Sequence, residues 1–150
     1  MAISSKGDPL SDLNEDLARR DFTVNAMAYS PTRGLCDPFR GADDLKIGII
    51  RAVGDPIKRF TEDSLRILRA FRFAARLGFE IEEKTADSIR RNKHLLKNIA
   101  PERIRVELEK LLLGDDAERI LLDFSDVIFE IETENATTYE WQYKVSGDET

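Results

Sequence analysis

The chain is poor in the residues from which many redox and metal sites are built. Its 150 residues include one cysteine, Cys36, and one histidine, His94. One cysteine excludes an internal disulfide, and one cysteine with one histidine cannot assemble a Cys/His zinc site. Since His94 is flanked by Arg91, Lys93 and Lys97, we expect it at a solvated helix position and not as a catalytic base.

Long apolar runs are missing as well. No stretch of 18 residues is free of charge, and residues 1–10 lack a basic start followed by an apolar segment. We therefore expect neither a membrane span nor a signal peptide. With 41% hydrophobic and 35% charged residues, the composition is that of a globular protein, and a reducing, cytoplasmic location is expected.

The net charge of −6 is distributed unevenly along the chain. Residues 1–50 carry a net charge of −2, residues 51–110 carry +5, and residues 111–150 carry −9. An anionic ligand such as a nucleotide or an RNA backbone would be attracted by the middle segment and repelled by the last one.

The most informative pattern is a predicted helix over residues 61–77 that begins with an acid pair and continues with evenly spaced arginines. At 100° per residue, the arginine side chains fall within a stripe about 120° wide. These residues are Arg66, Arg69, Arg72 and Arg76. Another set has the spacing of a core-facing stripe: Leu65, Leu68, Phe71 and Ala75. On these residues alone, the arginine stripe could also be an ordinary solvated face with an Asp63–Arg66 ion pair.

The first third of the chain is predicted to mix helix and strand. A short helix is expected at residues 20–28, and the turn residues 30–34 predict a hairpin with its second arm at 35–38. A helical turn at 43–46 and a strand at 49–53 follow.

The rest of the chain is predicted to be mainly helical. After the arginine helix, closed by Gly78, further helices are expected from residue 82 or 85 to 98, from Pro101 to Gly114, and over 115–125. Alternating residues at 128–134 predict a strand that pairs with 137–145 in a C-terminal β-hairpin. The predicted fold class is α+β, a mixed first part followed by a helical bundle.

Several blocks of this sequence resemble the class II tRNA nucleotidyltransferases, that is the CCA-adding enzymes, and the bacterial poly(A) polymerases. The match extends over roughly residues 12–127, with the blocks in the family's order and spacing. They are RRDFTVNAMAY at 19–29, DPFRG at 37–41 followed by Asp44 and Leu45, IRAVGDP at 50–56, RFTED at 59–63, and APERIRVELEK at 100–110.

The resemblance implies a nucleotide-binding site. In that family the Asp and Arg of a Glu-Asp-x-x-Arg motif, here Asp63 and Arg66, pair with the incoming base in place of a template strand. A carboxylate accepts from an exocyclic amine, and a guanidinium donates to the neighbouring acceptor, which favours C and A over U and G. By the same resemblance Arg69, Arg72 and Arg20 are expected to contact the nucleotide.

One family feature does not occur in the sequence. Family members hold two metal ions, Mg²⁺ in the parent reaction, with a Gly-Gly loop and an Asp-x-Asp pair. Neither motif occurs in these 150 residues, and no metal site is identified. The expected domains are therefore the end of a nucleotidyltransferase head at 1–55, a helical neck for nucleotide and RNA recognition at 56–127, and a tail at 128–150 that does not resemble the family.

Together these observations predict the CTP- and ATP-recognising portion of an enzyme that adds C and A to tRNA 3′ ends, with this chain alone inactive in transfer. Two alternatives stay open. The chain could be a helical RNA-binding module without catalysis, or a fragment that associates with a second copy through uncovered head surface.

Overall fold

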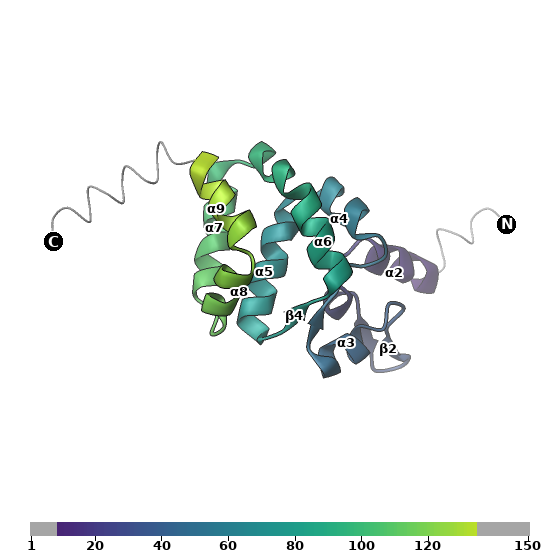
Figure 1. Cartoon of the computed structure of the whole chain (residues 1–150). Helices are drawn as coiled ribbons and strands as arrows, with labels where there is room; N and C mark the ends of the chain where they lie inside the picture. Colours follow the sequence, from purple (N-terminus) through teal and green to yellow (C-terminus); the bar gives the residue numbers. More distant parts are fainter. Residues whose placement is uncertain (1–8, 135–150) are drawn as a thin grey trace.

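The computed structural model describes residues 9–134, in which helices predominate and four short strands form two pairs (Figure 1). The α+β fold class is confirmed. In chain order the elements are α2 (Pro9–Ala18), η1 (Thr23–Asn25), β1 (Ala28–Ser30), β2 (Gly34–Cys36), α3 (Gly41–Ile47), β3 (Ile49–Ile50), α4 (Pro56–Glu62), α5 (Leu65–Leu77), β4 (Glu80–Ile81), α6 (Glu83–Asn92), η2 (Lys93–Asn98), α7 (Pro101–Leu112), α8 (Ala117–Asp123) and α9 (Ser125–Glu134).

The four strands form two separate pairs, a local hairpin and a pair that joins distant parts of the chain. The predicted hairpin is confirmed: β1 and β2 are antiparallel, with Ala28 opposite Cys36. Gly34 has a φ of +76°, the left-handed conformation that a tight turn needs. Strand β3 is shorter than predicted and pairs in parallel with β4, Ile49 opposite Glu80. This second pair joins the first third of the chain to the start of α6.

The short helix predicted over residues 20–28 is wrong except for the single 3-10 turn η1. The backbone before η1 is extended and bonded across the chain. Thr23 N–H donates to the Arg51 carbonyl at 2.9 Å, and Val53 N–H donates to the Asp21 carbonyl at 3.0 Å. These long-range bonds compete with helix formation at residues 21–23, and they place Asp21 beside the helical part.

Helix α3 is fixed by a cap and by close contact with η1. The Asp37 carboxylate accepts hydrogen bonds from the backbone N–H groups of Gly41 at 2.6 Å and Ala42 at 2.9 Å. A Cβ added to Gly41 would lie 2.0 Å from the Thr23 carbonyl oxygen, so no side chain fits there. The DPFRG block therefore encodes a capped helix packed against η1.

Arg51 ties this first part to α6. Its guanidinium contacts Asp44, with Nε 3.0 Å from Oδ2, and also Glu82. The hydrogen bond to the Asp44 carboxylate is the main cause that raises the pKa of Arg51. Glu82 in turn accepts from the Thr85 hydroxyl at 2.7 Å, which accepts from the Ala52 N–H at 3.1 Å. A polar network thus holds residues 44–52 against the start of α6.

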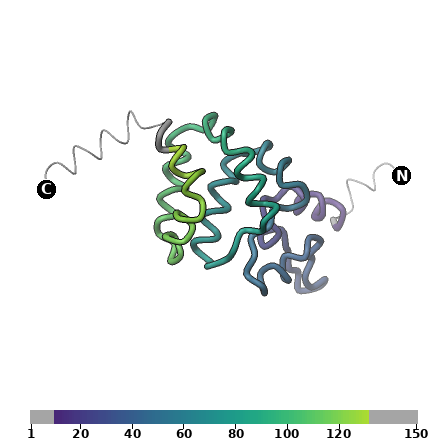
Figure 2. Tube along the Cα trace, in the orientation of Figure 1, coloured from purple at the N-terminus to yellow at the C-terminus, as the bar shows by residue number. Residues whose placement is uncertain are grey.

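Helix α5 is the central element, with α7 and α8 on one side of it and α4 and α6 on the other (Figures 1 and 2). The predicted core stripe is confirmed, since its members are at most 8% exposed: Leu65, Leu68, Phe71 and Ala75. The Phe71 ring packs on Phe124, with centroids 4.7 Å apart.

The predicted helix ends around α5 and α7 are also confirmed. Gly78 closes α5 in the left-handed conformation, with φ +71°. Pro101 occupies the first turn of α7, where its missing N–H costs no hydrogen bond. After α7, the turn at Gly114 lies directly against α5: an added Cβ would be 2.8 Å from the Ala75 carbonyl carbon.

The C-terminal strand predicted at 128–134 is wrong, because these residues belong to α9. Val127, Ile128 and Ile131 are buried and join the main core. Their spacing suits a helix, and packing against η2 decides between the two periodicities. The second arm predicted at 137–145 lies outside the described residues.

No helix within residues 9–134 has the length and apolar character to cross a bilayer. The longest, α5, has 13 residues, whereas a span takes about 20.

Candidate functional site

The acid pair lies at a break between two helices. The prediction of one continuous helix over 61–77 is wrong, because α4 ends at Glu62 and α5 begins at Leu65. Asp63 is extended, with φ −152° and ψ 99°, and its Oδ1 accepts from the Leu65 N–H at 3.2 Å. Such side-chain bonds compete with helical backbone bonding, which explains the break. Asp63 is therefore carried by a turn and not by the arginine face of α5.

Glu62 bridges two arginines. Its Oε1 lies 3.0 Å from Arg59 Nη2 and its Oε2 lies 3.1 Å from Arg66 Nη1. Arg59, whose side chain is only 7% exposed, also donates to the Ala18 carbonyl at the end of α2. Both oxygens of Glu62 are thus occupied. Of the two acids, Asp63 is the one whose Oδ2 has no partner within the part of the chain that the structure describes.

Arg66 is anchored by its neighbours and still has donors to spare. Besides Glu62, it donates to the Arg59 carbonyl at 3.3 Å and to the Arg19 carbonyl at 2.9 Å. Among the described residues no ion pair joins it to Asp63, so the simple surface pair considered from the sequence is not formed. A guanidinium has five N–H donors, three of which are used here. Two are left for a ligand.

Arg69 is held by a buried carboxylate from the Arg-Arg-Asp block. Its Nε lies 2.7 Å from Oδ2 of Asp21, which is 6% exposed. Oδ1 of Asp21 accepts from the Phe22 N–H at 2.8 Å and from the Asn25 amide at 3.3 Å. Asp21 is therefore fixed by three donors, and it orients Arg69 through Nε alone. Both Nη groups of Arg69 have no hydrogen bond to any described residue.

Arg20 lies between the two residues that contact α5, because Arg19 meets Arg66 and Asp21 meets Arg69. Its own side chain is half exposed, pairs with Asp16 at 3.0 Å and reaches the Asn25 carbonyl at 3.5 Å. The structure thus brings residues 19–21 to the start of α5.

Arg72 is directed to another neighbour. Its Nη1 lies 3.2 Å from Oε2 of Glu107 on α7, and both side chains are at most 10% exposed. Its guanidinium carbon also lies 4.6 Å from the centroid of the Phe73 ring, against 5.2 Å for Arg69. The predicted single arginine stripe is therefore divided: Arg66 and Arg69 face residues 19–21, Arg72 faces α7, and Arg76 is exposed.

Several residues that shape this site were not singled out from the sequence. Asp21, Arg59 and Glu107 lie inside the motif blocks, but each has a partner distant in the chain: Arg69 for Asp21, the Ala18 carbonyl for Arg59, and Arg72 for Glu107. Their presence in the blocks was the available signal.

A cluster of carboxylates that could hold a magnesium ion by itself is not found in the part of the chain that the structure describes. Among residues 10–131, no three His, Cys, Asp or Glu side chains are grouped so as to hold a metal. Two aspartates that have an aspartate as sequence neighbour make structural contacts: Asp44 binds Thr23 and Arg51, and Asp116 binds Arg119.

Two models of known sequence families match this chain, one before α4 and one after α5. The sequence model of the poly A polymerase head domain matches residues 3–51, and that of the probable RNA and SrmB-binding site of polymerase A matches residues 78–126. The CCA-adding enzyme of Anoxybacillus flavithermus is 56% identical over 102 residues, 68% of this chain and 26% of that protein. The chain belongs to the class II CCA-adding enzyme family. The family resemblance of the motif blocks is confirmed, although it begins earlier than residue 12.

Solved structures of this family share the fold. The CCA-adding enzyme of Bacillus stearothermophilus in complex with CTP is 48% identical, with a TM-score of 0.71 over 73% of this chain and 28% of that one. That of Thermotoga maritima complexed with tRNA is 40% identical, with a TM-score of 0.68 over 77% of this chain and 30% of that one. A CCA-adding enzyme with ATP matches with a TM-score of 0.70 at 38% identity, over 78% of this chain and 29% of that one.

The chain spans only part of its relatives. It covers 26% of the Anoxybacillus flavithermus enzyme and 36% of the CCA-adding enzyme of Leuconostoc mesenteroides, to which it is 45% identical over 144 residues, or 85% of its own length.

Proposed function

We propose that the α4–α5 turn of this chain recognises the base of CTP or ATP, as part of a tRNA nucleotidyltransferase that adds C and A to tRNA 3′ ends. The observation that supports the proposal is that Glu62 and Asp63 have different partners. Glu62 contacts both Arg59 and Arg66, while Asp63, three residues before Arg66 in the chain, keeps a carboxylate oxygen that no described residue contacts.

The chemistry of the bases gives this pair its selectivity. Cytosine and adenine both present an exocyclic amine next to a ring nitrogen acceptor. Asp63 would accept from the amine, and Arg66 would donate to the acceptor. Uracil and guanine present a carbonyl where the amine would be, so a carboxylate oxygen would face an oxygen. Such an unpaired contact costs more than a missing bond.

The other proposed site residues would bind the rest of the nucleotide. Arg69 offers its free Nη groups, and Arg20 is exposed enough to turn from Asp16 toward a phosphate. Arg72 stays a proposed nucleotide contact on the family resemblance alone, because its guanidinium is buried and paired with Glu107.

A four-nucleotide titration tests the base-recognition proposal. Calorimetry with CTP, ATP, UTP and GTP should show weak binding that favours the first two. Asp63→Ala and Arg66→Ala should each remove that preference, whereas Asp87→Ala, which replaces an exposed acid on α6, should retain it. An unchanged preference in both site variants would refute the assignment.

The lack of nucleotide transfer by this chain alone is a separate part of the proposal. It is supported by the absence of an Asp-x-Asp motif from the sequence and of a metal-holding cluster from residues 10–131. Incubation of the purified chain with Mg²⁺, labelled ATP and tRNA is expected to leave the tRNA unlabelled; a labelled 3′ end would contradict this.

Association with a second copy through head surface, and a cytoplasmic location, stay predictions. Exposed apolar side chains on the first part of the chain favour association, among them Tyr29, Leu35 and Ile47. Sedimentation over a range of concentrations distinguishes a monomer from an oligomer.

A further inference from the structure

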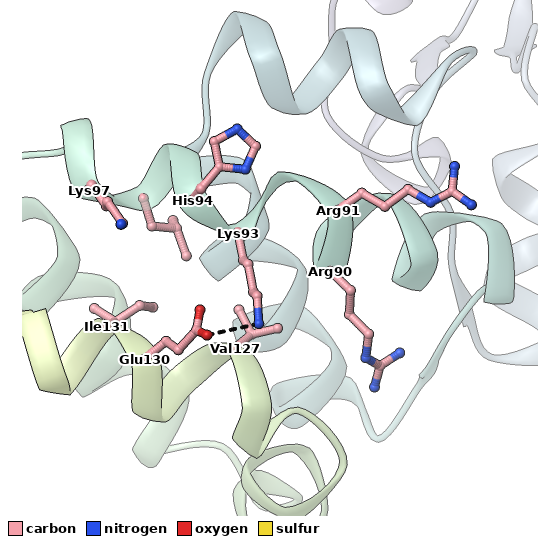
Figure 3. Close-up of a pocket in the computed structure, with 9 residues that line it drawn as sticks. Arg90, Arg91, Lys93, His94, Lys97, Val127, Glu130 and Ile131 are labelled. Atoms are coloured by element: carbon pink, nitrogen blue, oxygen red, sulfur yellow. Dashed lines mark hydrogen bonds and ion pairs between the residues drawn. The ribbon is translucent and has the colours of Figure 1, made fainter.

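A cavity of about 150 Å³ lies where the end of α6 and η2 meet α9. Its apolar lining comes from Leu96 of η2 and from Val127 and Ile131 of α9 (Figure 3). Apolar cavities of about this volume bind a benzene-sized ring, whereas pockets for whole drug-sized molecules measure about 300–1,000 Å³. The cavity is therefore matched in size to one aromatic ring.

The mouth of this cavity is positively charged. Among the described residues, four cations line it, all from residues 90–97, against one carboxylate, that of Glu130. Figure 3 shows Arg91 and His94 directed away from the apolar side chains, whereas Lys93 reaches across to Glu130, with Nζ 3.0 Å from Oε1. The other oxygen of Glu130 has no hydrogen bond to a described residue. A ring that enters the cavity thus meets an apolar floor, a cation and a hydrogen-bond acceptor.

The segment that follows α9 has the residue types that such a cavity binds. Residues 135–150 lie outside the described residues, and their sequence has Tyr139, Trp141 and Tyr143 at alternate positions. The same residues include three acids and one lysine, a net charge of −2. Tyrosine and tryptophan are favoured where an apolar surface meets polar or cationic groups. The segment therefore complements the cavity in apolar character and in charge.

We propose that the six-membered ring of the Trp141 indole occupies this cavity, so that the chain's own C-terminal segment docks between η2 and α9. Tryptophan is the best aromatic partner for a cation at its face, here Lys93. Its indole N–H needs an acceptor when it is buried, which the second carboxylate oxygen of Glu130 supplies. Glu140, the preceding residue, would then lie near the cations of residues 90–97 and lower the positive charge that they present.

The chain is long enough for this contact. Trp141 lies seven residues beyond Glu134, where α9 ends, and seven residues reach at most about 23–25 Å. The cavity lies about one helical turn back along α9, because Ile131 is three residues, or about 4.5 Å, before that end. A turn after α9 would bring Trp141 to the cavity. The contact does not involve Asp63 or Arg66, so it is independent of the proposed function.

The fluorescence of Trp141 reports the contact, because it is the only tryptophan in the chain. We expect the full chain at low salt to emit at shorter wavelength than the same chain in urea, and to be quenched less efficiently by acrylamide. Lys93→Glu should shift the emission toward its position in urea, since it replaces the cation with a repelling acid. Lys84→Glu, an exposed lysine at the other end of α6, is the matched control and should leave the emission unchanged.

A proximity measurement locates the tryptophan. Bimane is a fluorophore that tryptophan quenches at short range. In a Cys36→Ser chain, bimane attached at Arg91→Cys should be quenched, and Trp141→Phe should restore its emission. Arg91 is suitable because it is exposed at the mouth of the cavity and directed away from the floor. Lys46→Cys is the matched control, because Lys46 is an exposed cation on α3, in the first part of the chain.

Mixing separates this contact from docking on a second copy. Labelled Arg91→Cys chains that also carry Trp141→Phe should stay bright when unlabelled chains with Trp141 are added. Quenching in the mixture would mean that the segment docks on another copy, and it would overturn the proposal. Equal quenching of the labels at Arg91→Cys and Lys46→Cys would overturn it as well, as would an emission of the parent chain equal to that in urea.

Urea denaturation identifies which aromatic side chain is docked. Trp141→Ala should lower the urea midpoint more than Tyr139→Ala, and Trp141→Phe should retain most of the parent's value because a ring still fills the cavity. A larger loss for Tyr139→Ala would contradict the assignment of Trp141. Far-UV circular dichroism checks that each variant is folded, and if Lys93→Glu is not, Lys93→Gln replaces it.

Discussion

Arginines on α5 meet carboxylates on two sides, and water reaches the two contacts to different extents. Arg69 pairs with Asp21 with 33% of its side chain exposed, whereas Arg72 pairs with Glu107 with 10% exposed. A guanidinium that water already reaches can bind a ligand's phosphate while it stays paired with its carboxylate, and the cost in free energy is modest. A buried one cannot change partner without leaving a charge unpaired in the interior. One side of α5 is therefore suited to binding, and the other holds α5 to α7.

The largest loss of stability is expected when Glu107, the carboxylate on the buried side of α5, is removed. Glu107→Ala should destabilise the chain by about 3–5 kcal/mol, because Arg72 is left buried without its partner. Urea denaturation measures the loss. Glu109→Ala provides the control, since its pair with Arg105 is more than 60% exposed on both sides and should contribute less than about 1 kcal/mol.

A double substitution checks the reason for that loss. Combining Glu107→Leu with Arg72→Met removes both charges and should recover much of the stability. If the double variant is no more stable than Glu107→Ala, the buried charge is not the cause.

The next largest effect is expected at the turn that packs on the same side of α5. In Gly114→Ala the new Cβ would lie 2.8 Å from the Ala75 carbonyl carbon and 2.9 Å from its Cβ, so α5 and the turn must move apart. We expect a loss of about 1–3 kcal/mol, measured by the same denaturation. Leu113→Ala changes the neighbouring residue, which is 85% exposed, and should have little effect. Equal values for the two variants would mean that the close approach is not needed for stability.

The sequence was sufficient where local chemistry decides the structure. Gly78, Pro101 and the turn at 30–34 have residue types with one dominant conformational use, and the structure agrees with each prediction. The residues that form the core stripe of α5 were also predictable, because a helical period is visible along the chain.

Competing local bonds and long-range contacts explain what could not be predicted. Asp63 could have continued the helix, but its side chain accepts from the Leu65 N–H instead. Likewise, no local pattern shows that Arg72 meets a carboxylate 35 residues later, or that residues 128–134 pack on η2 as a helix. The sequence identified the arginines, while partners distant in the chain determine which way each one faces.

On the solvated side of α5, Arg69→Ala should have a smaller effect on stability and a clear one on binding. Asp21 is 6% exposed and would lose its charged partner, but it keeps its bonds to Phe22 and Asn25, so we expect a loss of about 1–3 kcal/mol, less than for Glu107→Ala. Affinity for both CTP and ATP should fall by about tenfold through loss of a charged contact, with no change in the ratio between them. Arg76→Ala, at an exposed position further along α5, is the matched control. A change in base preference would place Arg69 at the base and contradict this role.

Asp63→Asn is expected to change stability least, because it alters the binding group and leaves the backbone contact in place. Asn and Asp cap backbone N–H groups about equally well, so the contact with Leu65 should persist and the free energy of unfolding should stay within about 0.5 kcal/mol. The other half of the side chain changes from an acceptor to a donor. Facing an exocyclic amine, that donor would be unpaired, whereas the carbonyl of uracil or guanine could accept from it. Calorimetric titration should then show weaker CTP and ATP binding and a gain for UTP and GTP relative to them. If the order of the four affinities stays that of the parent chain, Asp63 does not read the base, and the solvated side of α5 binds nucleotides through charge alone.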